Sequence, residues 1–180
     1  MARAGLSLLL VFVVGLVFNA DGAFLKWETH RDMLRQISVF GVLACGMTLV
    51  IISGGIDLSV GSVMALAAVV FSLLSIHQGW PAVFAVAAAL VTGALCGVIS
   101  GGIIAKLRVQ AFIATVAIMV LARGVAMMVS GGQKISTAIQ KPDGSYHYVE
   151  VPTLFDTLNA RILGDNVATV SLILAICVVF

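Results

Sequence analysis

The sequence predicts an all-α fold, a polytopic transmembrane helix bundle with about five complete spans and the beginning of a sixth. Three observations predict it. Apolar residues make up 61% of the 180 residues and charged residues only 10%, against roughly 45–50% and about 25% in globular proteins. The mean hydropathy is +1.17. Apolar runs of about 20 residues, the length that crosses a bilayer, recur along the chain. We therefore treat residues 1–180 as one transmembrane domain.

The composition also excludes several classes of protein. Disorder requires low hydrophobicity and high charge, and the opposite is found here. The three cysteines, Cys45, Cys96 and Cys177, are too sparse for a disulfide-stapled secreted module. A net charge of +2 without a basic block excludes a nucleic-acid partner and leaves membrane lipid as the expected surroundings. No Walker A motif and no metal-ligand spacing are found, so we expect no cofactor, metal or catalytic residue.

The apolar runs give the positions of the spans. They are predicted at Ala4–Leu25, Ile37–Ile56, Leu58–Ile76, Pro81–Ala105 and Ala111–Ser130, with a sixth beginning at Val167. The sixth run is too short to cross before Phe180, so we expect a piece of a longer protein or a truncated product. A cleaved signal peptide is the alternative for the first run. Asp21 stands where a small residue is wanted before cleavage, which favours an uncleaved span.

Polar connections give an expected topology. Lys106–Gln110 carries two basic and no acidic residues, which predicts a cytoplasmic loop. The segment 131–166 then lies on the extracytoplasmic side, and the alternation in Tyr146–Val151 predicts a short strand there. Lys26–Gln36, which contains Trp27, fits equally a short interfacial helix and an ordinary loop.

A row of small residues runs along the fourth predicted span. Gly93, Gly97 and Gly101 recur every four residues, which places them in one stripe on a helix. Such stripes let helix backbones approach closely in lipid. We interpret this row as a helix-packing face and not as a ligand site.

The join between the second and third spans is physically unusual. Ile37–Ile76 is long enough for two crossings, yet the region Ser53–Ser62 at its middle is rich in glycine and serine and contains Asp57. A carboxylate at the centre of a bilayer costs roughly 2.5–3.5 kcal/mol. One interpretation is a tight cytoplasmic turn in which Asp57 or Ser59 caps the N-terminus of the third span. The other is a discontinuous helix whose break lines a solute path. In either case the structural or hinge positions are Gly54, Gly55 and Gly61.

Three stretches carry a resemblance to a known family. They are Gly46–Ser62 with its centre Gly-Gly-Ile-Asp-Leu-Ser-Val-Gly-Ser, then Gly101–Thr115, and finally Leu121–Gly124 followed by Ser130–Gly132. Together they resemble the membrane permease subunits of ribose/xylose/galactose-type ABC sugar importers. The resemblance covers about residues 34–136 in the correct order.

The resemblance implies a function and a set of partners. Permeases of this family form a homodimeric or pseudo-dimeric pore in the bacterial inner membrane, so a second permease copy is expected. A periplasmic sugar-binding protein delivers the sugar, and segment 131–166 would help to form its docking face. An ABC ATPase subunit hydrolyses ATP, and the permease is not itself an enzyme. Family members are about twice this length, and their ATPase-coupling loop lies in the second half.

Side chains for the solute path are chosen for their hydrogen-bonding groups. Asp57, Ser59 and Ser62 are the first choices, with Thr48 as a weaker one. Arg123 lies inside the fifth predicted span. It fits a functional pair with Asp57 or a structural salt bridge or interhelical hydrogen bond, and we favour the structural role.

These observations lead to an expected function with stated alternatives. We expect the permease subunit of a binding-protein-dependent importer of a monosaccharide. A truncated, non-transporting membrane protein is one alternative, and a permease for another small polar solute, such as a nucleoside or a branched-chain amino acid, is a second. An intramembrane hydrolase that uses Asp57 lacks a partner acid or base at helical spacing.

Overall fold

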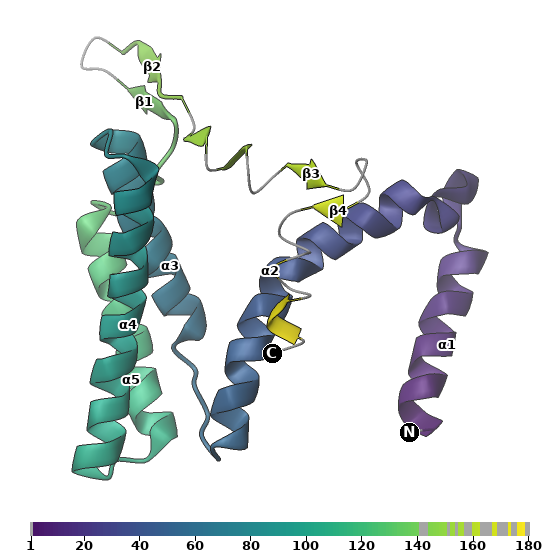
Figure 1. Ribbon diagram of the computed structural model, residues 1–180, viewed down its shortest axis with the longest axis horizontal. Helices are drawn as coiled ribbons and strands as arrows, with labels where there is room; N and C mark the ends of the chain where they lie inside the picture. The colour runs from purple at the N-terminus through teal and green to yellow at the C-terminus, as the bar shows by residue number, and fades with distance from the viewer. Residues whose placement is uncertain are drawn as a thin grey trace. The chain divides into compact units, whose positions relative to one another are not determined.

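The computed structural model describes residues 2–140, 144–150, 152–153, 155–156, 160–162, 167–168, 173 and 176–178. Its regular structure is mostly helical, with short paired strands toward the C-terminus (Figure 1). The chain divides into two compact units, one formed by Met1–Cys45 with Leu158–Phe180 and the other by Gly46–Thr157. The boundary falls inside a helix, between Cys45 and Gly46.

The first predicted span ends earlier than the sequence indicates. Helix α1 covers Ala2–Val17, and a 3₁₀ helix, η1, follows at Ala20–Leu25. The side chain of Asn19 accepts a 2.9 Å hydrogen bond from the Phe24 N–H, and Gly22 has a φ of +74°, so a local turn replaces the last helical turns. The predicted helix over Ala4–Leu25 is therefore wrong at its C-terminal end. At 16 residues, α1 is shorter than the roughly 20 that a span needs.

Helix α2 joins two segments that the sequence analysis separated. It runs without interruption through Trp27–Ile52. Residues 27–36 are therefore helical and not a loop, and they continue directly into the apolar span. Neither glycine nor proline interrupts the sequence between Trp27 and Phe40, so nothing in the backbone ends the helix at the polar–apolar boundary.

The predicted sixth helix does not begin at Val167. Val167–Ala168 forms strand β4, which pairs antiparallel with β3 at Arg161–Ile162. The expectation of a helix from Val167 is therefore wrong at its start. Ile173 and residues 176–178 are helical, and the other residues of this predicted span lie outside the described residues.

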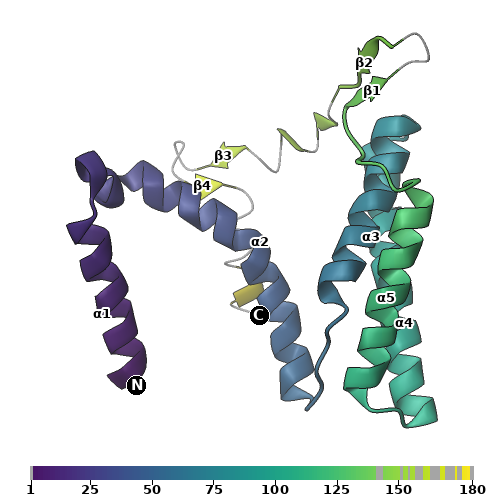
Figure 2. The same cartoon turned by 180° about the vertical axis from the view of Figure 1, so that it is seen from behind.

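Three helices form the bundle of the second unit. Helix α3 (Val60–Ser72) continues as a π-helix, η2 (Leu73–His77), and packs with α4 (Ala82–Leu107) and α5 (Ala111–Val129). They lie side by side in both views (Figures 1 and 2). Leu66 of α3 packs with Ala122 and Ala126 of α5, whose small side chains permit close approach.

Four helices are long and apolar enough to cross a bilayer. They are Trp27–Ile52, Val60–His77, Ala82–Leu107 and Ala111–Val129. They coincide with the second to fifth predicted spans within a few residues, apart from the longer start of α2. The predicted polytopic helical fold is confirmed for this part of the chain.

The glycine row of α4 is only partly used inside this bundle. Gly93 lies beside Val63 of α3, at 4.0 Å from the position a Cβ would take. A Cβ at Gly97 or Gly101 would meet no other described atom within 4 Å. The buried small residues of α4 are instead Ala85 and Ser100. A packing role for Gly97 and Gly101 stays a prediction.

The polar connections of the second unit lie at opposite ends of the bundle. The turn after α4, where Arg108 has a φ of +54°, lies at one end, and the hairpin of β1 (Ala138–Gln140) and β2 (Tyr146–Tyr148) lies at the other (Figure 1). The predicted strand in Tyr146–Val151 is confirmed. The ring of Phe155 contacts Phe71 of α3 at a centroid distance of 5.6 Å, which ties the segment after α5 to the end of α3.

Candidate functional site

A hydrogen-bonded cap ends α2 before the break. The N–H of Gly54 donates to the Ile51 carbonyl and the N–H of Gly55 to the Val50 carbonyl, both at 3.0 Å. Gly54 has a φ of +77°, so these contacts form a Schellman motif that requires glycine at this position. The Ser53 hydroxyl also donates to the Val50 carbonyl, at 2.7 Å. Residues 53–59 are consequently non-helical.

The Asp57 carboxylate organises the chain just ahead of α3. Its Oδ1 accepts from the Ser59 N–H at 2.7 Å and from the Ser59 hydroxyl at 2.6 Å. Ser59 is the residue before α3, and only 3% of its surface is exposed. Neither side chain caps the first-turn N–H groups of α3 in the described structure, so the predicted capping role is wrong. The carboxylate lies two residues before the cap and closes a local turn instead.

A buried threonine holds the break against α5. The hydroxyl of Thr115 lies 3.3 Å from the Ile56 carbonyl and 3.2 Å from that of Phe112 in its own helix. Thr115 is 3% exposed. Our sequence analysis did not single it out, although a hydroxyl within an apolar span is a signal for interhelical hydrogen bonding.

The first turn of α3 lies level with the middle of its neighbours. A cavity of about 530 Å³ brings Gly61 and Ser62 of α3 opposite Met119 and Arg123 of α5, which is about 28 Å long with these residues near its centre. Val63 likewise lies beside Gly93, halfway along α4. The chain therefore does turn at Ser53–Gly55, as the first interpretation expects, but a non-helical segment separates this turn from α3, and both interpretations of the join stay predictions. The chain ends α2, runs back without helical structure, and resumes α3 at mid-height.

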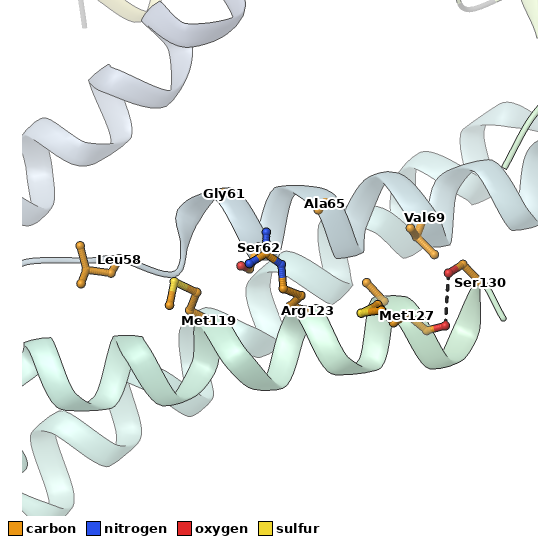
Figure 3. A pocket seen from close by; sticks show the side chains of 10 residues that line it. Leu58, Gly61, Ser62, Ala65, Val69, Met119, Arg123, Met127 and Ser130 are labelled. Carbon is orange, nitrogen blue, oxygen red and sulfur yellow. Dashed lines mark hydrogen bonds between the residues drawn. The ribbon is translucent and has the colours of Figure 1, made fainter. Parts of the chain in front are cut away.

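The cavity opens between α3 and α5 (Figure 3). Its lining is Leu58, Gly61, Ser62, Ala65, Val69, Met119, Arg123, Ala126, Met127 and Ser130, with no residue from α4. The side chain of Arg123 points from α5 toward α3, beside Ser62 (Figure 3). The Ser130 hydroxyl donates to the Met127 carbonyl at 3.3 Å.

The structure separates the predicted path residues into two groups. Ser62 lines the cavity, whereas Asp57 and Ser59 bond to each other beside it. Thr48 lies on an exposed position of α2 and does not line the cavity. Arg123 makes no ion pair with Asp57 or with any other residue that the structure describes, so either role considered for it stays a prediction. The same described residues include no group of three or more potential metal ligands.

Comparison with known proteins identifies similar sequences. A family model described as "branched-chain amino acid transport system / permease component" matches residues 30–180. The ribose import permease protein RbsC of Escherichia coli K12 is 45% identical over 129 residues, covering 71% of this chain and 40% of that protein. The xylose transport system permease protein XylH of the same strain is 37% identical over 136 residues, covering 76% and 34%.

A third relative is named for a different sugar. The galactofuranose transporter permease protein YtfT of E. coli K12 is 38% identical over 133 residues, covering 71% of this chain and 38% of that protein. The chain thus spans about 40% or less of the length of these relatives. No solved structure matches it.

The family match and the four apolar helices agree on the kind of protein. Together they make the chain a multi-pass protein of the bacterial inner membrane. The relatives are permeases, which move a solute and are not themselves enzymes. Since the family model matches most of the sequence, the chain belongs to the family of branched-chain amino acid transport system permease components, BPD_transp_2.

Proposed function

We propose that this chain forms part of the permease subunit of an ABC importer that carries a monosaccharide across the inner membrane. The observation that supports this most strongly is the non-helical segment 53–59 that leads into α3, beside a cavity level with the middle of α5, in a chain 45% identical to a ribose import permease. Helices broken at the bilayer midplane are a recurrent way to build a solute site in transporters. Non-helical backbone at that depth is tolerated where it is buried in protein or lines water.

The proposed path uses the polar groups around this break. Ser62 would contact the solute directly, because it lines the cavity. Asp57 and Ser59 would support the path by holding the segment before α3, since they bond to each other. Thr48 would act at the α2 side, and Gly54, Gly55 and Gly61 would permit the change in chain direction. These few hydrogen-bonding groups suit weak, transient binding.

The partners follow from the proposed role. An ABC ATPase subunit would hydrolyse ATP, and a periplasmic sugar-binding protein would deliver the solute. A second permease copy would complete the pore. Segment 131–166 is the proposed docking face for the binding protein, and its hairpin lies at the bundle end opposite the Lys106–Gln110 turn.

A second solute class has one specific observation in its favour. The description of the matching family names branched-chain amino acid transport, whereas the three relatives are named for ribose, xylose and galactofuranose. The names of the relatives favour a sugar. Competition with unlabelled leucine against labelled sugar would separate the two classes.

The experiment is uptake by the assembled importer. The permease is reconstituted in liposomes with its ATPase subunit and binding protein, and accumulation of labelled ribose, xylose and galactose is followed with and without ATP. We expect ATP-dependent accumulation of one of these sugars, and a strong reduction for Asp57→Ala. An assembled complex that hydrolyses ATP but accumulates none of the three sugars would contradict the proposal.

A further inference from the structure

The cavity between α3 and α5 is lined by a cation, Arg123, that makes no ion pair with any residue the structure describes. Arg123 lies twelve residues after the start of α5 and six before its end, so both ends of the helix are several ångströms away. Its side chain points sideways toward Ser62 and not along the helix to an end (Figure 3). A guanidinium at this depth is expensive to expose to lipid tails. The face that carries it must therefore meet water or a polar group.

Hydrogen-bond donors that have no partner among the described residues also lie in the segment that leads into α3. Among the described residues, the N–H groups of Ile56, Asp57 and Leu58 have no partner, and Leu58 lines the cavity. The Ser62 hydroxyl also has no partner within that part of the chain. Backbone donors left unpaired at membrane depth require water or an adjacent polar surface. This observation is independent of Arg123 and points to the same conclusion.

The chemistry of the cavity wall defines what it would accept. Arg123 offers only donors, and its charge repels cations. Apolar side chains, among them Ala65, Val69 and Met119, form the rest of the wall. Hydroxyl, ring and carboxylate oxygens satisfy the donors, and the C–H faces of a sugar ring suit the apolar part.

We infer that the α3–α5 cavity is a water-accessible contact site for oxygen-rich, neutral or acidic solutes. Arg123 is its specificity-determining residue and excludes cationic solutes. The solute class rests on the proposed transport function, whereas water access and the positive potential of the cavity do not. This role differs from the structural role that we first favoured for Arg123.

Charge-selective thiol labelling tests the site directly. Ser62→Cys is made in a permease in which Cys45, Cys96 and Cys177 are replaced by alanine. Labelling rates are measured in native membranes with an anionic sulfonatoethyl and a cationic trimethylammonioethyl methanethiosulfonate. We expect both reagents to react and the anionic one to be favoured. Arg123→Gln should lower the anionic-to-cationic rate ratio about tenfold, because one unit charge near the thiol is removed.

Two matched variants control for indirect effects. Arg108→Gln removes a positive charge at the α4–α5 turn, away from the cavity lining, and should leave the ratio unchanged. Val98→Cys lies on an exposed position of α4 outside the cavity, and its labelling should not respond to Arg123→Gln. Labelling after denaturation in detergent verifies that each cysteine is present and reactive.

The outcomes separate this inference from the proposed function. A Ser62→Cys thiol that reacts only after denaturation would show a cavity filled by protein or lipid and would overturn the inference. A reactive thiol with an unchanged ratio in Arg123→Gln would overturn the role of Arg123. If labelling behaves as expected but the assembled wild-type importer accumulates no sugar, the proposed function fails and the electropositive aqueous site remains. In a transporting assembly, Arg123→Gln should reduce sugar uptake while ATP hydrolysis stimulated by the binding protein persists.

Discussion

The sequence Ser-Gly-Gly ends two helices, α2 and α5, with the same pattern of hydrogen bonds. At Ser53–Gly55 and at Ser130–Gly132, the serine hydroxyl donates three residues back, and the two glycine N–H groups close a Schellman motif. The chain behaves differently afterwards. After the first cap it is held by Thr115 and Asp57 and resumes a helix at mid-height, whereas after the second it leaves the bundle toward β1. The same local signal thus ends two crossing helices, and the contacts that follow it decide whether the chain returns into the bundle or leaves it.

The largest expected effect is the loss of the Asp57 carboxylate. Asp57→Ala removes the acceptor of both Ser59 bonds, so the segment after the first cap would lose the contacts that hold it ahead of α3. We expect a destabilisation of about 2–3 kcal/mol, measured by denaturant titration in detergent, together with a strong loss of uptake. Asp57→Asn keeps one acceptor oxygen and should lose less. If Asp57→Ala were as stable and as active in uptake as the wild type, the Asp57 contacts would not be what distinguishes the first cap from the second.

Alanine at the left-handed glycine of each cap compares them directly. A Cβ at Gly54 or Gly131 meets no described atom within 4 Å, so the cost is torsional. Gly54→Ala and Gly131→Ala should each destabilise by about 1–2 kcal/mol in the same titration. Uptake should fall further for Gly54→Ala, because its cap precedes the break beside the cavity. Equal uptake losses for the two variants would show that the break has no special role.

Removing the Thr115 hydroxyl tests the attachment of the break to α5. Thr115→Val keeps the shape and removes the donor to the Ile56 carbonyl, with an expected cost of about 1 kcal/mol. Thr92→Val is the matched control, since the Thr92 hydroxyl bonds within its own helix, to the Ala88 carbonyl at 2.8 Å. A smaller loss is expected there. If Thr92→Val costs as much, the Thr115 contact contributes nothing specific to the break.

The serines of the two caps should show the smallest effects. Their hydroxyls bond the carbonyl three residues earlier, at 2.7 Å for Ser53 and 3.3 Å for Ser130, and both bonds are exposed. We expect Ser53→Ala and Ser130→Ala each to change the free energy of unfolding by no more than about 0.5 kcal/mol, with the larger change at Ser53. A cost above that of Gly54→Ala would mean that the serine, and not the glycine, carries the cap.

The fold was predictable where it depends on local composition. Apolar run length located the second to fifth spans, and alternation located the strand at Tyr146–Tyr148. The end of α1 was missed because the turn at Asn19 depends on a specific side-chain bond to Phe24. The start of α2 was missed because the polar residues before Ile37 fit a loop as well as a helix, and the absence of glycine and proline between Trp27 and Phe40 lets the helix extend through them.

The candidate site was predictable only in part, for a geometric reason. The polar content of the region from Ser53 to Ser62 marked it as unusual, and two interpretations remained. To choose between them one must know how far α3 is shifted along α5, and a hydropathy profile gives no information about this shift. Ser62 and Arg123 are 61 positions apart in the sequence, and their proximity likewise depends on how α3 and α5 pack together. Periodicity describes the faces of one helix and says nothing about the level at which two helices meet.

The contact between Phe71 and Phe155 connects the segment after α5 to one end of α3, and the other end of α3 carries Ser62 of the cavity. Phe71 lies near one end of α3 and Ser62 near the other, nine residues or about 14 Å apart along a continuous helix. A helix is stiff along its axis, so a push on the segment that carries Phe155 displaces the Ser62 end as well. A force applied at the end of the bundle that carries the hairpin would therefore move the wall of the cavity.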